Sequence, residues 1–244
     1  MKINCDMGES FGIWKMGRDE EIMPYLDMAN IACGMHASDP SVMTKTVKMA
    51  KQYQVSIGAH PGYADLQGFG RRCIQMMPED LAALFIYQVG ALQAICQSEN
   101  TSLSYVKPHG ALYNAMMEDD KVFTCLLNGL KNYNKSLPLV IMAIPDYSRY
   151  QDLAEAYGIK LWFEAFVDRA YGCDGRLVPR SEPGSLHTTI GAIEKQALQL
   201  LEQGSVTTLT GNRIPVYADT LCIHGDGSLA LSVAKLLYDR VAHL

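Results

Sequence analysis

Four histidines of this 244-residue sequence stand at or near the end of a short apolar segment, beside glycine or proline. They are His36, His60, His109 and His224. Two carboxylates, Asp6 and Glu9, follow the first apolar segment in the same way. Imidazole and carboxylate groups are the side chains that most often move protons or hold metal ions in enzymes. Because the carboxyl ends of parallel strands meet at one rim of a sheet or barrel, we expect these groups to form one active site.

One aspartate with two histidines suits a divalent metal ion, since this set leaves coordination positions for water and substrate. Asp6, His60 and His109 can supply it. Such an ion polarises a carbonyl group and lowers the pKa of bound water. The same side chains can instead form a hydrogen-bonded proton relay without a metal, because no closely spaced motif such as His-Glu-x-x-His is present. Both interpretations stay open at the level of the sequence.

Cationic side chains follow other apolar segments and suit an anionic substrate. Arg71 and Arg72 end a glycine-rich segment, and their guanidinium groups can each bind a carboxylate or phosphate through two hydrogen bonds. A flexible loop with solvated arginines is the alternative. Lys107 ends a later apolar segment and can neutralise charge that develops on a substrate oxygen. Further side chains expected to contact the substrate are His36, Glu164, Arg169, Arg180, His224 and Asp226.

Two kinds of chemistry lack their usual sequence signature. There is no Gly-x-Ser-x-Gly segment, and Cys5 and Cys33 fall inside apolar segments, so a covalent nucleophile is disfavoured. There is also no Gly-x-x-x-x-Gly-Lys-Ser/Thr segment and no Gly-x-Gly-x-x-Gly after a strand. If a nucleotide takes part in the reaction, either this chain binds it without these loops or a partner binds it.

Short apolar segments alternate with longer segments of helical periodicity, which is typical of a β/α fold with a mostly parallel sheet. The expected strands are Lys2–Cys5, Met28–Cys33, Val55–Ala59, Tyr105–Lys107, Leu139–Ile144, Lys160–Ala165 and Leu221–Ile223. Helices are expected after Asp39-Pro40, after Pro78, around Val122–Leu130, around Ile190–Leu200 and near Leu229–Leu237. Gly211-Asn212 predicts a hairpin turn before the last strand.

Composition limits the class of protein. Hydrophobic residues make up 48% of the chain and no linker or repeat divides it, so we expect one domain over residues 1–244. A formal charge of -5 without a basic cluster disfavours nucleic-acid binding, and no apolar run reaches the length of a membrane span. Seven cysteines without a Cys-x-x-Cys pair, together with a polar start of the chain, predict free thiols and a cytoplasmic location.

Several longer motifs resemble those of the LamB/YcsF family, in the same order and along almost the whole chain. They are Asn4–Gly12, Asn30–Ala37, Gly58–Tyr63, Gly68–Arg72, Val106–Asn114, Glu164–Phe166 with Asp168-Arg169, Leu177–Arg180 and Leu221–Asp226. The family usually has glycine where this chain has Ser38, and commonly an Asn-Pro pair near Gly227-Ser228. Both departures concern the shape of loops.

The resemblance implies a distorted seven-stranded β/α barrel similar to the glycoside hydrolase/deacetylase group. It implies the activity of the A component of ATP-dependent 5-oxoprolinase, which cleaves the lactam of 5-oxo-L-proline to L-glutamate together with subunits B and C. In related metal-dependent deacetylases an aspartate and two histidines hold the metal, at places comparable to Asp6, His60 and His109. Arg71 or Arg72 is then expected on the substrate carboxylate.

For catalysis, the resemblance implies that Asp6 or Glu9, with His60 or His109, activates water. Phosphorylation of the lactam oxygen by ATP would make the carbonyl carbon a better electrophile. Two other functions stay open at this stage. One is a free-standing metal-dependent amidase or carbohydrate deacetylase, and the other is a non-catalytic module that binds a lactam or a sugar.

Overall fold

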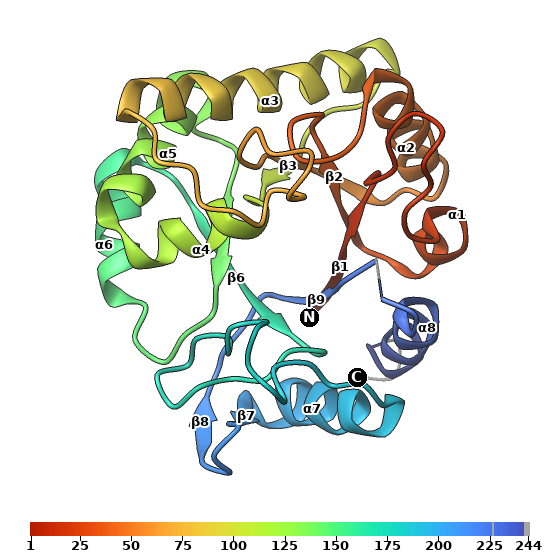
Figure 1. Ribbon diagram of the computed structural model, residues 1–244, viewed down its shortest axis with the longest axis vertical. Helices are drawn as coiled ribbons and strands as arrows, with labels where there is room; N and C mark the ends of the chain where they lie inside the picture. The colour runs from red at the N-terminus through yellow and green to blue at the C-terminus, as the bar shows by residue number, and fades with distance from the viewer. Residues whose placement is uncertain (226, 242–244) are drawn as a thin grey trace.

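Seven parallel strands form a closed barrel in the computed structural model, which describes residues 1–225 and 227–241 (Figure 1). In barrel order the strands are β1 (Lys2–Met7), β2 (Met28–Ala32), β3 (Ser56–His60), β4 (Tyr105–Val106), β5 (Leu139–Met142), β6 (Leu161–Phe166) and β9 (Thr220–Ile223). Cys5 of β1 lies beside Ala29 of β2 on one side and beside Ile223 of β9 on the other. The first and last strands of the chain therefore close the barrel, and the predicted seven-stranded β/α barrel is confirmed.

Helices surround the barrel on its outer side (Figure 1). They are α1 (Asp19–Ile22), η1 (Met23–Tyr25), α2 (Pro40–Gln52), α3 (Pro78–Ser98), α4 (Gly110–Glu118), α5 (Asp120–Asn134), α6 (Ser148–Tyr157), α7 (Ile190–Gln203) and α8 (Ala230–Val241). As predicted, Asp39 begins α2, because its carboxylate accepts hydrogen bonds from the backbone N–H groups of Ser41 and Val42. Pro78 is the first residue of α3, where its missing N–H costs no hydrogen bond.

The long helix α3 has the length and apolar composition of a helix that can cross a membrane. Here one of its faces is buried, with Phe85, Val89 and Leu92, and the helix packs against α5 and β3. This amphipathic placement is that of an outer helix of a barrel. Within the described ranges no other helix has comparable length and composition.

The hairpin predicted at Gly211 is present, because β7 (Ser205–Thr207) pairs antiparallel with β8 (Arg213–Pro215) outside the barrel. The helices α1, α4 and α6 and the 3-10 helix η1 did not follow from the sequence patterns. No side-chain cap marks the start of α4, which follows His109 directly. The end of α6 does carry a signal, since Gly158 adopts the left-handed conformation there with φ 70°.

The interior of the barrel is apolar at the amino ends of the strands and polar at their carboxyl ends. Alternate residues of each strand point inward. The apolar end holds a cluster of Met28, Tyr105, Val140 and Trp162. Two residues further along their strands come the buried polar side chains Asn30, Lys107 and Glu164. The polar end therefore lies at the carboxyl ends of the strands.

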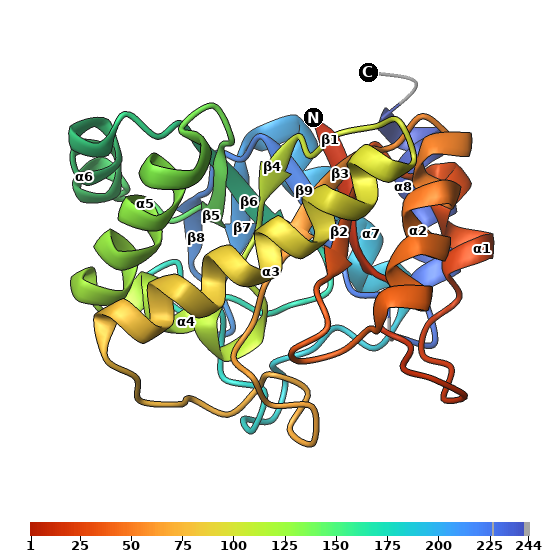
Figure 2. The same ribbon diagram turned by 90° about the horizontal axis from the view of Figure 1, so that it is seen from above.

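The long loops after β1, β3 and β6 extend from this same end of the barrel, while the N-terminus lies at the opposite end (Figure 2). The loop after β3 spans residues 61–77, and the loop after β6 spans residues 167–189. Parallel strands fix the ends of these loops against one another. Side chains that are far apart in the sequence are thereby gathered at one rim, as expected.

Candidate active site

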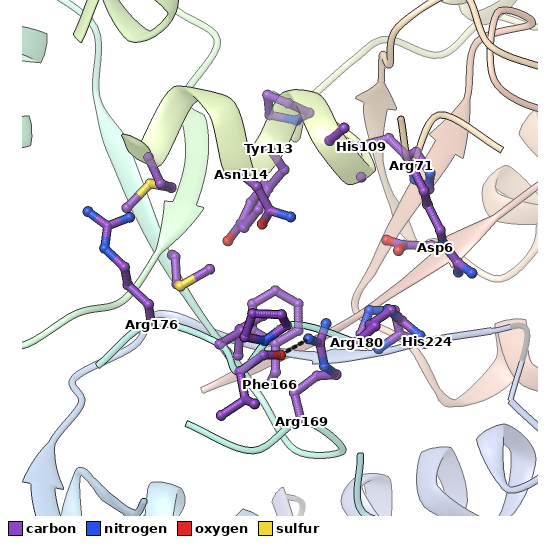
Figure 3. A pocket seen from close by; sticks show the side chains of 18 of the residues that line it. Asp6, Arg71, His109, Tyr113, Asn114, Phe166, Arg169, Arg176, Arg180 and His224 are labelled. Atoms are coloured by element: carbon purple, nitrogen blue, oxygen red, sulfur yellow. Dashed lines mark hydrogen bonds between the residues drawn. The ribbon is translucent and has the colours of Figure 1, made fainter. Parts of the chain in front are cut away.

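A cavity of about 690 Å³ opens at the carboxyl end of the barrel (Figure 3). Predicted site residues that line it are Asp6, Glu9, His60, Arg71, Lys107, His109, Arg169, Arg180 and His224. His36, Arg72 and Glu164 are not part of the lining. Asp226 lies outside the described residues. Most of the predicted site thus comes together, and its aspartate, lysine and histidines share one cavity.

The ammonium group of Lys107 is buried at the floor of the cavity between two carboxylates. Its Nζ lies 3.0 Å from Oδ1 of Asp6 and 2.8 Å from Oε1 of Glu164. Burial lowers the pKa of Lys107, but the carboxylates outweigh this effect and hold that pKa well above its ordinary value. Burial also opposes ionisation of Asp6, yet Lys107 and His60 hold the pKa of Asp6 well below its ordinary value. Asp6 and Lys107 are therefore an ion pair at neutral pH, and Glu164 lies next to Lys107 rather than on the cavity wall.

Asn30 holds the Asp6 carboxylate in place through a hydrogen bond. Its Nδ2 donates to Oδ1 of Asp6 at 2.8 Å and to Oδ1 of Asn4 at 2.7 Å. Its own Oδ1 accepts a hydrogen bond of 2.7 Å from the Tyr105 hydroxyl. This network was not predicted from the sequence. The available signal was an asparagine inside an otherwise apolar strand, because a buried amide is stable only when it is hydrogen-bonded.

His60 and His109 face each other through one nitrogen of each ring. Nδ1 of His60 lies 2.7 Å from the backbone oxygen of Lys107, and Nε2 of His109 lies 2.8 Å from that of Phe69. A carbonyl oxygen only accepts, so both of these nitrogens carry hydrogen. The other two nitrogens, Nε2 of His60 and Nδ1 of His109, are 3.0 Å apart and hold lone pairs when the rings are neutral. Oδ1 of Asp6 lies 3.4 Å from Nε2 of His60.

His36 lies behind this pair rather than at the cavity. Its ring stacks on His109 with centroids 3.8 Å apart and an angle of 4° between the planes. Burial and the neighbouring imidazoles lower the pKa of His36 well below its ordinary value, and they lower the pKa of His109 to about 3. Both rings are therefore neutral at pH 7. Gly70 allows this packing, since a Cβ at Gly70 would lie 2.7 Å from the His36 Cβ.

The three predicted metal ligands face one another, because Nε2 of His60 lies 3.0 Å from Nδ1 of His109 and 3.4 Å from Oδ1 of Asp6. Four potential ligand atoms lie within 4.8 Å of one another, and they belong to Glu9, His36, His60 and His109. Lone pairs lie in the ring planes, so the parallel rings of His36 and His109 cannot both direct one at the same ion. Asp6 is already bound by Lys107 and Asn30. The remaining ring nitrogens of His60 and His109 bond backbone carbonyls, as those of metal-bound histidines commonly do.

Two guanidinium groups, those of Arg169 and Arg180, lie across the cavity from Tyr113 and Asn114 (Figure 3). Arg169 is 7% exposed, and its Nη2 donates a hydrogen bond of 2.7 Å to the backbone oxygen of Val178. Burial and the charge of Arg180 lower the pKa of Arg169 to about 10. Closely spaced guanidinium groups of this kind favour an anionic ligand.

Arg71 and Arg72, which the sequence analysis grouped together, have separate environments. Arg71 lines the cavity and lies over the Phe69 ring, 5.0 Å from its centroid. Nε of Arg72 instead donates a hydrogen bond of 3.0 Å to Oδ1 of Asp65. Only Arg71 of the two is thus placed to meet a ligand in this cavity.

His224 forms a second acid–base unit with Asp168. Its Nδ1 lies 2.8 Å from Oδ2 and 3.0 Å from Oδ1 of Asp168. Burial raises the pKa of Asp168, but the charge of His224 and its hydrogen bond outweigh this, and the net pKa lies below its ordinary value. The ring of His224 also stacks on Phe166, with centroids 5.7 Å apart. The imidazole is therefore held by a carboxylate and by an aromatic face.

Comparison with known proteins shows the family of the chain. The family model described as "LamB/YcsF family" matches residues 1–243. The chain belongs to the LamB/YcsF family. A relative from Vibrio vulnificus (strain YJ016), named as the A subunit of 5-oxoprolinase, is 51% identical over 242 residues, covering 99% of this chain and 97% of that protein. One of the same name from Chromohalobacter salexigens is 48% identical, covering 97% of this chain and 95% of the relative.

A solved structure shows that this barrel recurs among proteins similar to this LamB/YcsF chain. It is the lactam utilization protein from Thermus thermophilus, with a TM-score of 0.92 and 39% sequence identity. The match covers 100% of this chain and 96% of the other. The resemblance found in the motifs is thus confirmed for both family and fold.

Proposed function

We infer that this chain is the A subunit of an ATP-dependent 5-oxoprolinase, which opens the lactam of 5-oxo-L-proline to give L-glutamate. The observation that carries the inference is about 50% identity, over nearly the whole chain, to proteins named as the A subunit of 5-oxoprolinase. The solved relative named for lactam utilization supports the same substrate class. The buried ion pair, the His60–His109 pair and the His224–Asp168 pair at one cavity favour an enzyme over a simple binding module.

The cavity suits a substrate that has one carboxylate and one cyclic amide. Arg169, Arg180 and Arg71 line it and can bind the carboxylate through charge-assisted hydrogen bonds. Lys107 offers positive charge at the floor, where the lactam oxygen gains negative charge during ring opening. A volume of about 690 Å³ lies within the range for small-molecule sites and leaves room for a phosphoryl group on the lactam oxygen.

The proposed 5-oxoprolinase function requires ATP and partner subunits. A five-membered lactam is an unreactive amide, and phosphorylation of its oxygen creates a more electrophilic carbon. Because the sequence has neither of the common phosphate-binding glycine motifs, we assign ATP binding to the assembly with subunits B and C. The proposed location is the cytoplasm, where ATP is available.

The divalent metal stays a prediction. When bound, such an ion would polarise the carbonyl and lower the pKa of a bound water. Elemental analysis of the purified chain, before and after dialysis against a chelator, tests for it. His60→Gln and His109→Gln should lower the metal content if their imidazoles hold an ion.

Reconstitution tests the proposed function. Subunits B and C are supplied with ATP and 5-oxo-L-proline, and glutamate is measured with this chain present or withheld. We expect glutamate only when all three proteins are present. Full turnover without this chain contradicts the proposal. Release of acetate from an acetylated sugar by the chain alone, without ATP, would instead favour a carbohydrate deacetylase.

A further inference from the structure

Among the imidazoles at the rim, His224 has a hydrogen-bonding pattern of its own. His60 and His109 use both ring nitrogens, one on a backbone carbonyl and one on each other. His36 is buried and stacked on His109. His224 uses Nδ1 for Asp168, and no hydrogen bond from the described residues reaches its Nε2. His224 also lines the cavity, so this nitrogen is the one available to a ligand or to water.

The Asp168 carboxylate determines which nitrogen of His224 carries the lone pair. Its lowered pKa keeps Asp168 ionised at neutral pH, and an ionised carboxylate only accepts hydrogen bonds. Nδ1 of His224 must therefore donate, which places the lone pair of the neutral ring on Nε2. Stacking on Phe166 holds the plane of the ring. The same logic orients the histidine of a catalytic triad.

Asp6 lies within reach of the His224 ring through a single water molecule. One ring nitrogen of His224, a carboxylate oxygen of Asp6 and the sulfur of Cys222 lie within 4.8 Å of one another. Two hydrogen bonds of about 2.8 Å each can bridge that separation. Asp6 is a weak base, because Lys107 and His60 hold its pKa low, so it orients such a water without deprotonating it.

We propose that His224 is a catalytic residue that transfers the proton of the attacking water, and that Asp168 is its positioning residue. This role rests on the proposed function. The water oxygen forms a bond to the lactam carbonyl carbon while one proton passes to Nε2 of His224. The bond between that carbon and the ring nitrogen then breaks, and the same proton passes to the nitrogen, which becomes the amine of the product. Lactam and water supply all atoms of this step. If the lactam oxygen carries a phosphoryl group, the same step gives an acyl phosphate, and a second water then releases phosphate to leave glutamate.

Charged groups of both signs lie around His224. They belong to Asp6, Lys107, Asp168, Arg169 and Arg180, next to the Cys222 thiol.

The test uses the complete complex with 5-oxo-L-proline and ATP. His224→Ala should lower kcat about 10²- to 10⁴-fold with little change in KM, and added imidazole should restore part of kcat. Asp168→Asn should also lower kcat, because an amide can accept or donate and no longer fixes the tautomer. Asp152→Asn, an exposed aspartate on α6, is the matched control and should keep wild-type kcat. Unfolding curves confirm that each variant is folded, and His224→Gln replaces His224→Ala if the latter is not.

Two results overturn the role of His224. One is a kcat within about threefold of wild type in His224→Ala. The other is a rise in KM alone with no response to imidazole, which would make His224 a binding residue. A wild-type complex that forms no glutamate instead contradicts the proposed function itself, so the two failures are distinguishable.

Discussion

Lys107 carries the positive charge that holds two buried carboxylates together at the floor of the cavity. Asp6 and Glu164 lie within 3.0 Å and 2.8 Å of its Nζ, and Lys107 itself is 3% exposed. Removing one partner of a buried ion pair leaves an uncompensated charge in a poorly solvated place. The consequence is a side chain on which both stability and substrate binding depend.

Lys107→Met should therefore destabilise the fold by about 3–5 kcal/mol and abolish activity. Chemical denaturation followed by circular dichroism measures the first effect. The double variant Lys107→Met, Glu164→Gln removes one of the stranded charges and should recover part of the stability but none of the activity. A single variant that loses less than about 1 kcal/mol would contradict the ion-pair assignment.

Ser38 is a buried residue with strained backbone geometry, because its φ is 74° in the region that favours glycine. Ser38→Gly relieves this conformation and should stabilise the fold by about 0.5–1 kcal/mol. Thermal or urea unfolding measures the change. Ser98→Gly, in the last turn of α3, is the control and should not stabilise the protein.

The sequence predicted which residues form the site better than it predicted their hydrogen-bond partners. The strand-end positions of Asp6, His60, His109 and His224 were enough to place them at one cavity. Their hydrogen bonds depend on backbone carbonyls such as that of Phe69, and on which ring nitrogen faces which group. No pattern of residue types encodes those details, so His36 was expected at the substrate although it packs behind His109.

Among the elements, the loop at residues 61–77 positions more of the site than any pattern suggested. Its Phe69 supplies the carbonyl that fixes His109, and its Arg71 lines the cavity. The loop is held by Asp65, whose Oδ1 accepts hydrogen bonds of 3.0 Å from the Gly68 N–H and from Nε of Arg72. The hydrogen bond from Arg72 lowers the pKa of Asp65 to about 2.

Asp65→Asn should lower the melting temperature at neutral pH, because the amide loses the charge that binds Arg72. The folded-state pKa of Asp65 lies below its unfolded value, so the wild-type advantage is present above about pH 4 and is lost as the pH falls toward 2. Melting temperatures of both proteins between pH 6 and pH 2.5 measure this. Arg72→Gln should show the same dependence, and a difference that stays constant down to pH 2.5 would contradict it.

Strands and long helices were predictable because their periodicity reflects burial on one or both faces. The exceptions have local causes. Helix α4 starts without a capping side chain, directly after the strand-end residue His109. The strand β4 contains only Tyr105 and Val106, which lie within the predicted strand Tyr105–Lys107. Its pairing with β3 and β5, which is a tertiary effect, positions His109.

All seven cysteines of the molecule are free, as the sequence predicted. Only Cys73 and Cys173 are exposed. A thiol-specific reagent should therefore modify two thiols in the native protein and seven after unfolding. Cys173 should react first, because hydrogen bonds from Thr210 and Asn212 lower its pKa. Cys173→Ser should remove the fast phase, and rapid reaction of any buried thiol would mean that the barrel opens in solution.

The N-terminus and the cavity entrance lie at opposite ends of the barrel. The first residue of the chain lies at the end away from the loops that frame the cavity (Figure 2). A protein tethered to a sensor chip through Met1 would accordingly turn its entrance toward the flowing solution. Small ligands and large assembly partners could then be compared on the same immobilised molecule, without the anchor blocking either.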